Sequence, residues 1–182
     1  MIDLHSRLTV GGFLSDKKPD SVVRCIMEKW FPVYGRMRGI HSDIGGEFSN
    51  EMMEEVAAKL GVELTTTASY SPQQNGLNER NHSFVDLMMT RMMLSDKTLS
   101  ADMALLWALT AKNSLENCYG FSPFQLHIGL NPLFPSTQDG PPSFVKVSKS
   151  EEFARHLNAM HAAREEFGEG RIVIRFKESS AR

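Results

Sequence analysis

The chain has 182 residues, of which 41% are hydrophobic, and its 20 Lys and Arg against 22 Asp and Glu give a formal net charge of -2. This length suits one domain with its own core and excludes two large domains. The net charge argues against a dedicated nucleic-acid-binding protein, because such proteins carry a strong excess of basic residues. Any contact with nucleic acid must therefore come from local basic patches or from bridging metal ions.

Cysteine usage and the absence of a targeting segment bear on the compartment. Cys25 and Cys118 stand far apart, without a CxxC pair or nearby histidines, which argues against a zinc site and a disulfide framework. No apolar run approaches the roughly 20 residues that cross a bilayer, and the start MIDLHSR lacks a signal-peptide core. We expect an intracellular protein, nuclear or cytoplasmic, with no membrane partner.

The first half of the chain alternates between strand and helix patterns. Loose alternation predicts strands, apolar residues at helical spacing predict helices, and Gly or Pro marks their ends. The predicted elements are a strand at 1–14, a helix at 19–30, a short strand at 37–40, a helix at 50–60 and a strand at 62–67. This order favours an α/β fold, in which helices cover a sheet.

The second half is helical. A long helix is predicted to begin near Leu77 or Asn78, a second helix covers 102–118, and a third covers 151–166 before a short strand at 171–176. Residues 120–135 are predicted to be irregular. The apolar faces predicted to be buried are, in order, Phe84, Leu87, Met88, Met92 and Leu94; Met103, Leu106, Trp107 and Thr110; and Phe153, Leu157 and Met160.

Two carboxylates form the candidate site. Asp43 follows a predicted strand, and Glu79 follows a loop punctuated by Pro72 and Gly76, with 35 residues between the two acids. An Asp at a strand end and a Glu in the first turn of a helix can converge at a sheet edge, where their oxygens suit Mg²⁺ or Mn²⁺. The nearby His41 is interpreted as a surface or packing residue.

Three segments carry a resemblance to a known family. HSDIGGEF, TTTASYSPQQNGLNERNH and WALTAKNSLENCYGFSPFQLHIGLNP resemble the catalytic core of retroviral and Ty3/gypsy-type retrotransposon integrases. The resemblance covers residues 1–135, which are predicted to be a partial integrase-like core, followed by a linker at 136–150 and a helical appendage at 151–182. It implies an RNase H-like fold, a mixed sheet with flanking helices.

The resemblance also implies roles for individual residues. Asp43 and Glu79 would be the second and third acids of a D,D-35-E triad, which binds Mg²⁺ or Mn²⁺ for phosphodiester chemistry on DNA. Four residues would contact DNA: Tyr70, Gln73, Asn75 and Arg80. The other interpretation of this segment is an ordinary surface turn.

The first acid of the triad has no clear counterpart. In the family it precedes a second strand that ends in a word similar to VDxxSR, and here residues 2–7 read IDLHSR. Either Asp3 substitutes as the third ligand, or the first Asp lies upstream of Met1. The expected sheet is therefore incomplete, lacking the first strand and most of the second, and we expect the chain alone to be unstable or rearranged.

Two functions remain open from the sequence. One is an integrase-like core whose ancestral DNA strand transfer is impaired, acting on retroelement ends and target DNA, with a homo-oligomer as a further expectation. The other is a non-enzymatic nucleic-acid or protein-binding module derived from such a core. An RNase H-like nuclease outside the integrases is a weaker match, because the sequence motifs of the loop and of the Glu-Arg pair, Glu79 and Arg80, resemble those of integrases.

Overall fold

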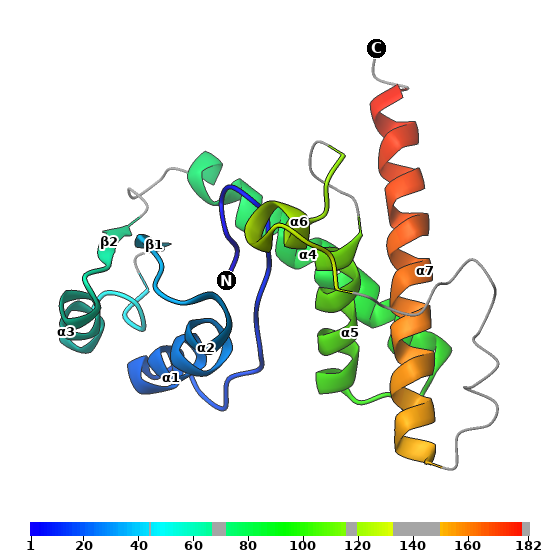
Figure 1. Ribbon diagram of the computed structural model, residues 1–182, viewed down its shortest axis with the longest axis horizontal. Helices are drawn as coiled ribbons and strands as arrows, with labels where there is room; N and C mark the ends of the chain where they lie inside the picture. The colour runs from blue at the N-terminus through cyan, green and yellow to red at the C-terminus, as the bar shows by residue number, and fades with distance from the viewer. Residues whose placement is uncertain (44, 67–71, 116–119, 133–149, 180–182) are drawn as a thin grey trace. The chain divides into compact units, whose positions relative to one another are not determined.

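The computed structural model describes the backbone of residues 1–43, 45–66, 72–115, 120–132 and 150–179, and the side chains of these except 72–75, 153 and 167–179 (Figure 1). The chain forms two compact units. We call Val10–Asn81 the sheet unit, and Met1–Thr9 together with His82–Arg182 the helical unit.

The sheet unit begins with two consecutive helices. Helix α1 covers Pro19–Lys29, and Pro19 suits a first helical position because its fixed φ and missing N–H cost nothing there. The prediction of a helix at 19–30 is confirmed, and Ile26 and Trp30 are buried, but Met27 is exposed. A single-turn helix α2, Phe31–Tyr34, follows directly.

A β-α-β arrangement forms the centre of the sheet unit. Strands β1 (Gly39–Ser42) and β2 (Glu63–Thr66) pair in parallel, and α3 (Glu51–Leu60) is the crossover helix between them. The Asn50 side chain caps α3 by accepting a hydrogen bond from the Met53 N–H, and Gly61 ends the helix in the left-handed conformation at φ 63°. These elements confirm the predictions for 50–60 and 62–67, and the strand predicted at 37–40 forms two residues later, at 39–42.

The core of the sheet unit is apolar and closely packed. Side chains of α1, α2, α3 and β1, with Val62 just before β2, line a cavity of only about 10 Å³; its lining residues are Val23, Ile26, Phe31, Ile40, Met53, Val56, Ala57, Leu60 and Val62. Burying these groups against one another is the main stabilising contribution to the unit. It packs Ile40 of β1 against α1 and α3.

The predicted strand at 1–14 is wrong. Asp3 Oδ2 accepts hydrogen bonds from the backbone N–H of His5 (3.2 Å) and of Ser6 (3.0 Å), and Arg7 adopts the left-handed conformation at φ 65°. These side-chain bonds close a turn, so that the segment makes only one isolated bridge, Ile2 to Thr9. The sequence alternation did not reveal this competition between side chain and backbone.

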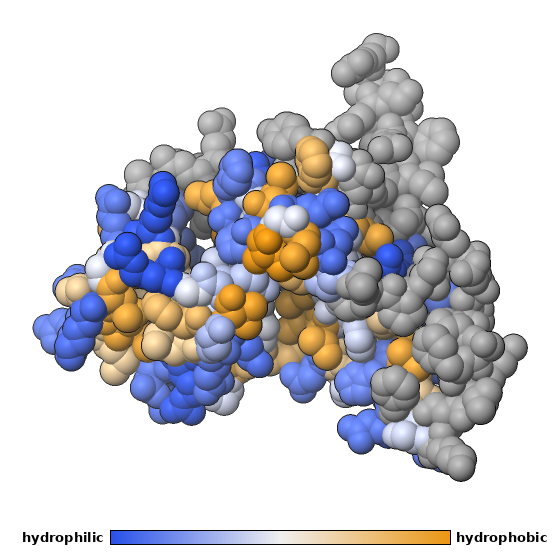
Figure 2. Space-filling model, viewed as in Figure 1, coloured by the Kyte–Doolittle hydropathy of each residue, from blue (hydrophilic) through white to orange (hydrophobic). Residues whose placement is uncertain are grey.

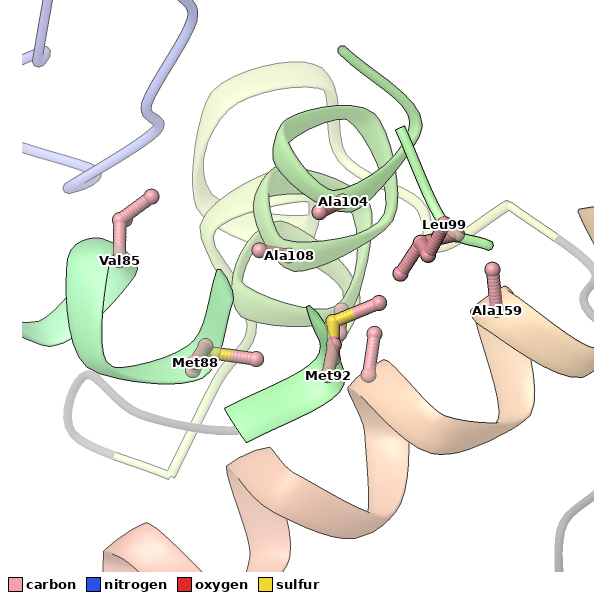
Figure 3. Packing of buried hydrophobic residues seen from close by; sticks show 9 residues of the cluster. Val85, Met88, Met92, Leu99, Ala104, Ala108 and Ala159 are labelled. Carbon is pink, nitrogen blue, oxygen red and sulfur yellow. The ribbon is translucent and has the colours of Figure 1, made fainter. Parts of the chain in front are cut away.

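The helical unit is built on three helices (Figure 3). They are α4 (Pro72–Ser95), which begins in the sheet unit, α5 (Ala101–Ser114) and α7 (Glu151–Ser179). Figure 3 shows Met88 and Met92 of α4 beside Ala104 and Ala108 of α5. The buried cluster comprises Val85, Met88, Met92, Leu99, Ala104, Ala108, Ala111, Ala159 and Ala163.

The buried face of α4 differs in part from the prediction. Met88 and Met92 are buried as predicted, but Leu87 and Leu94 are 46% and 62% exposed. Val85, Met88 and Met92 form the buried stripe at i, i+3 and i+7, and Leu87 lies about 100° around the helix from Met88. The prediction included Leu87 and Leu94, which lie outside the one stripe of the helix that faces the core.

The buried face of α5 was predicted only in part. Met103 and Trp107 are half-buried and pack against the core as predicted. Ala104, Ala108 and Ala111 are buried, whereas Leu106 is 50% exposed. Small side chains at the contact allow helices to approach more closely, and α5 packs extensively on α7 (Figure 1). A core made from alanines gives a weak hydrophobic signal in the sequence, which explains the error.

Polar contacts also join α5 to α7, and the shorter of two is that of Trp107 with His156. Trp107 Nε1 donates a hydrogen bond to His156 Nδ1 at 3.2 Å, and the two rings meet edge to face with centroids 5.9 Å apart. Trp107 is half-buried, and the bond satisfies its N–H at the helix contact.

Residues 120–135 were predicted to be irregular, which is wrong for the short helix α6, Pro123–Ile128. Ser122 and Gln125 form a capping box at its start, and Gly129 ends it in the left-handed conformation. Figure 2 shows apolar surface at α6, where Ile128 is 45% exposed. Capping contacts local in sequence are enough to specify this helix.

The predicted strand at 171–176 is also wrong, because α7 continues as helix through Ser179. Strand propensity depends strongly on context, and extending an existing helix costs little entropy per hydrogen bond gained. Leu157 and Met160 are buried as predicted. The predicted linker at 136–150 lies almost wholly outside the described residues, so the domain boundaries stay predictions.

Candidate metal centre

Asp43 lies at the carboxyl edge of the parallel sheet. It is the first residue after β1, directly following the last pair of the ladder, Ser42 with Thr66. Its side chain is exposed, and within the described part of the chain no hydrogen bond or ion pair engages its carboxylate. This position leaves the carboxylate oxygens open to a cation from solvent.

Glu79 lies on α4, but deeper in the helix than predicted. The helix begins at Pro72 rather than near Leu77, so Glu79 stands in its third turn and not its first. Pro72 and Gly76 were interpreted as loop residues, yet proline is well suited to the first turn of a helix, and a single glycine inside costs only about 1 kcal/mol. The Glu79 side chain is exposed.

The two carboxylates belong to the same compact unit, Val10–Asn81. Ile44 and residues 67–71, which flank Asp43 and precede α4, lie outside the described residues. No group of three or more His, Cys, Asp or Glu suited to a metal ion occurs among the described residues. Asp43 and Glu79 would supply two of the oxygen ligands of a hard divalent cation, with water completing the set, and they would fall short of a full two-metal site.

Three of the four predicted DNA-contacting residues lie on α4. Tyr70 is outside the described residues, and Gln73 and Asn75 belong to the first turn of the helix rather than to a loop. Arg80 is exposed, and its Nε donates a hydrogen bond to the Gly76 carbonyl at 3.1 Å. The roles assigned to these four residues stay predictions.

Asp3, the alternative third ligand, forms hydrogen bonds with its sequence neighbours His5 and Ser6. Besides its two backbone bonds, Asp3 Oδ2 accepts a hydrogen bond from the Ser6 hydroxyl at 3.1 Å. Partial burial raises the pKa of Asp3, but the hydrogen bonds from Ser6 and His5 lower it further, so that it lies below its usual value. Asp3 also belongs to the helical unit, whereas Asp43 and Glu79 belong to the sheet unit. The structure gives Asp3 the role of stabilising a turn.

Sequence reasoning missed a polar pair next to Asp43. His41 and Thr65 are directly paired in the β1–β2 register, and His41 Nδ1 lies 3.0 Å from Thr65 Oγ1. The available signal was positional, because each residue stands one place before the end of its strand. Detecting the pair required the register of the two strands.

The sequence is related to retroelement polyproteins, although no family model matches it. The chain is 27% identical over 108 residues to the Pol polyprotein of Feline endogenous virus ECE1. That match covers 59% of this chain and only 10% of the polyprotein. The chain thus spans about a tenth of the length of the Pol relative.

Solved integrase structures share the fold. The HTLV-2 integrase catalytic core domain in complex with magnesium, in its trimeric form, superposes with a TM-score of 0.61 at 20% identity, covering 69% of this chain and 80% of that one. A chain of the simian T-cell lymphotropic virus intasome, in complex with PP2A regulatory subunit B56 gamma, gives a TM-score of 0.66 at 21% identity, covering 78% of this chain and 52% of that one. The expected RNase H-like fold is confirmed. The two-stranded sheet among the described residues is consistent with the expected incomplete sheet.

Proposed function

We propose that the ancestral activity of this chain is metal-dependent DNA strand transfer, and that this activity is impaired here. By fold and by sequence relationship, the chain is an integrase-type core of retroelements. The observation that carries the proposal is the placement of Asp43 at the carboxyl end of β1 and Glu79 on α4 within one compact unit. In such sites, bound Mg²⁺ or Mn²⁺ activates the attacking oxygen and stabilises the leaving one.

Different residues of the protein would bind the cation and the DNA. Asp43 and Glu79 would hold the cation through their carboxylate oxygens. The Arg80 guanidinium, oriented by its bond to Gly76, would meet a DNA phosphate, and Tyr70, Gln73 and Asn75 would contact the DNA near its end. The HTLV-2 core, a structural neighbour, is in complex with magnesium, which supports the choice of cation.

The impairment follows from the number of ligands. Among the described residues no third carboxylate joins Asp43 and Glu79, and Asp3 is engaged in its own turn. A cation held by two carboxylates is bound weakly, and the clamp that stabilises both the entering and the leaving oxygen is incomplete. We therefore expect little or no strand transfer from this chain.

A strand-transfer assay with Mn²⁺ and retroelement-end DNA tests this proposal. We expect at most trace product, and weak Mn²⁺ binding that Asp43→Asn or Glu79→Gln abolishes. Robust product that either substitution abolishes would show that no further acid is needed, and would overturn the proposed impairment. Mn²⁺ binding that ignores both substitutions would overturn the assignment of the site.

The same ligand shortage favours a second candidate, a non-enzymatic nucleic-acid or protein-binding module. DNA binding that is indifferent to EDTA and to Glu79→Ala would support it, and a strict metal requirement would count against it.

None of the helices in the described ranges combines the length and apolar character of a membrane-spanning helix.

Partners and location are part of the proposal. The partners would be retroelement ends, target DNA and a second copy of the chain, and the location would be nuclear or cytoplasmic. The trimeric form of the HTLV-2 core and the intasome assembly of the simian virus support a homo-oligomer.

A further inference from the structure

We propose that His41 and Thr65 form a cross-strand clasp that positions Asp43 at the carboxyl edge of the sheet. This inference rests on the proposed function, because it assigns the clasp to the same metal site. His41 Nδ1 and Thr65 Oγ1 are 3.0 Å apart, and Asp43 is the second residue after His41.

The clasp lies next to the end of the ladder. The parallel ladder has four residue pairs, and His41 with Thr65 is the third, just before the last pair of Ser42 with Thr66. β1 leads directly into Asp43, and β2 leads toward α4 and Glu79. A bond between side chains here fixes the two strand ends from which both carboxylate-bearing segments depart.

Side-chain chemistry supports a bond between the two strands. Thr65 Oγ1 lies 3.0 Å from His41 Nδ1 and 3.5 Å from the Ile40 carbonyl oxygen. The hydroxyl either donates to the imidazole, or accepts from it while donating to Ile40. In both arrangements a side chain of β2 is tied to β1 next to the end of the strand.

Because His41 and Thr65 are exposed, we expect the clasp to affect the position of Asp43 more than the stability of the protein. Both side chains are exposed, so water competes for the bond, and its removal changes global stability little. Loss of the bond should have a larger effect on the placement of Asp43. Groups that orient a metal ligand change the affinity for the metal ion even when they do not touch it. The clasp acts through the backbone of β1 and not by contact with the cation.

The test measures Mn²⁺ affinity of the full chain by electron paramagnetic resonance of free Mn²⁺, with thermal unfolding recorded for each variant. His41→Ala and Thr65→Val remove either half of the bond, and the nearly isosteric valine keeps the strand intact. His41→Asn and Thr65→Ser keep a polar group at the bonding position. Glu63→Gln, at the other end of the ladder, is the matched control.

We expect His41→Ala and Thr65→Val each to weaken Mn²⁺ binding at least about threefold, less than the roughly 10–100-fold of groups bonded directly to a ligand. The double variant should lose no more than either single one. His41→Asn, Thr65→Ser and Glu63→Gln should bind as the unaltered chain does, and melting temperatures should stay close together.

Three results would overturn the clasp. Unchanged affinity in His41→Ala and Thr65→Val, while Asp43→Asn loses binding, refutes the clasp and leaves the proposed function standing. Additive losses that follow the melting temperature, without recovery in the conservative variants, show a purely structural role. No Mn²⁺ binding by the unaltered chain overturns the proposed metal site, and the clasp with it.

Discussion

The side-chain amide of Asn113 is hydrogen-bonded in both directions to the backbone of Thr9. The Thr9 N–H donates to Asn113 Oδ1 at 2.9 Å, and Asn113 Nδ2 donates to the Thr9 carbonyl at 2.7 Å. This pairing mimics one rung of a β-ladder and fastens the start of the chain to the end of α5. Lys112 supports it by donating to the Arg7 carbonyl and to the Thr9 hydroxyl.

Replacement of Asn113 by Ala should destabilise the helical unit by about 2–4 kcal/mol, because two buried backbone groups lose their partners. Urea unfolding measures the effect. Asn158→Ala, an exposed asparagine on α7, is the control and should change stability by less than about 0.5 kcal/mol. Equal effects of the two substitutions would show that the bonds to Thr9 are not important.

The depressed pKa of Asp3 predicts a pH dependence. A carboxyl whose folded pKa lies below its unfolded value of 3.8 contributes stability that is complete at neutral pH and is lost as the pH falls through 3.8 toward the folded pKa. Asp3→Asn can accept the same hydrogen bonds without the charge. The variant should be less stable than the unaltered chain at pH 7, and the difference should shrink in acid.

Urea titrations between pH 3 and pH 7 measure the Asp3 effect. Ser6→Ala, which removes one donor to Asp3, should raise the Asp3 pKa in an NMR titration. A stability difference that stays constant across this range would contradict a depressed pKa.

The alanine core of α5 predicts intolerance to larger side chains. Ala108 is fully buried, so Ala108→Leu should destabilise by about 1–3 kcal/mol through overpacking. Leu106→Ala, on the exposed side of the same helix, should cost less than about 1 kcal/mol. The order of the two urea midpoints would be reversed if α5 instead packed through the face predicted from its large residues.

Removal of α7 tests whether residues 151–182 form a separable appendage. Ala159 and Ala163 belong to the same buried cluster as α4 and α5, and Leu157 and Met160 are buried as well. Loss of two such large side chains costs roughly 2–5 kcal/mol each, which approaches the total stability of a domain. We expect a chain ending at residue 149 to lose cooperative unfolding of the helical unit, measured by circular dichroism. A self-contained appendage would leave that transition unchanged.

Local signals predicted the sheet unit well. The proline at the start of α1, the Asn50 cap and the Gly61 stop act within a few residues, and so the sequence shows them directly. Asp43 was placed correctly at a strand end for the same reason.

The errors arose where distant contacts decide the structure. Asn113 and Lys112 hold Arg7 and Thr9 from more than 100 residues away, and no strand pattern near residue 1 reveals them. The buried alanines of α5 depend on packing against α7. The clasp of His41 with Thr65 depends on the register of two strands, which the sequence spacing does not determine.

The chain's two tryptophans fall one to each unit. Trp30 packs against Tyr34 in the sheet unit, with ring centroids 5.0 Å apart, and Trp107 donates to His156 in the helical unit. Intrinsic fluorescence of the single-tryptophan variants Trp30→Phe and Trp107→Phe can therefore follow each unit separately. Coincident transitions would identify one cooperative folding body, and separated transitions would identify two.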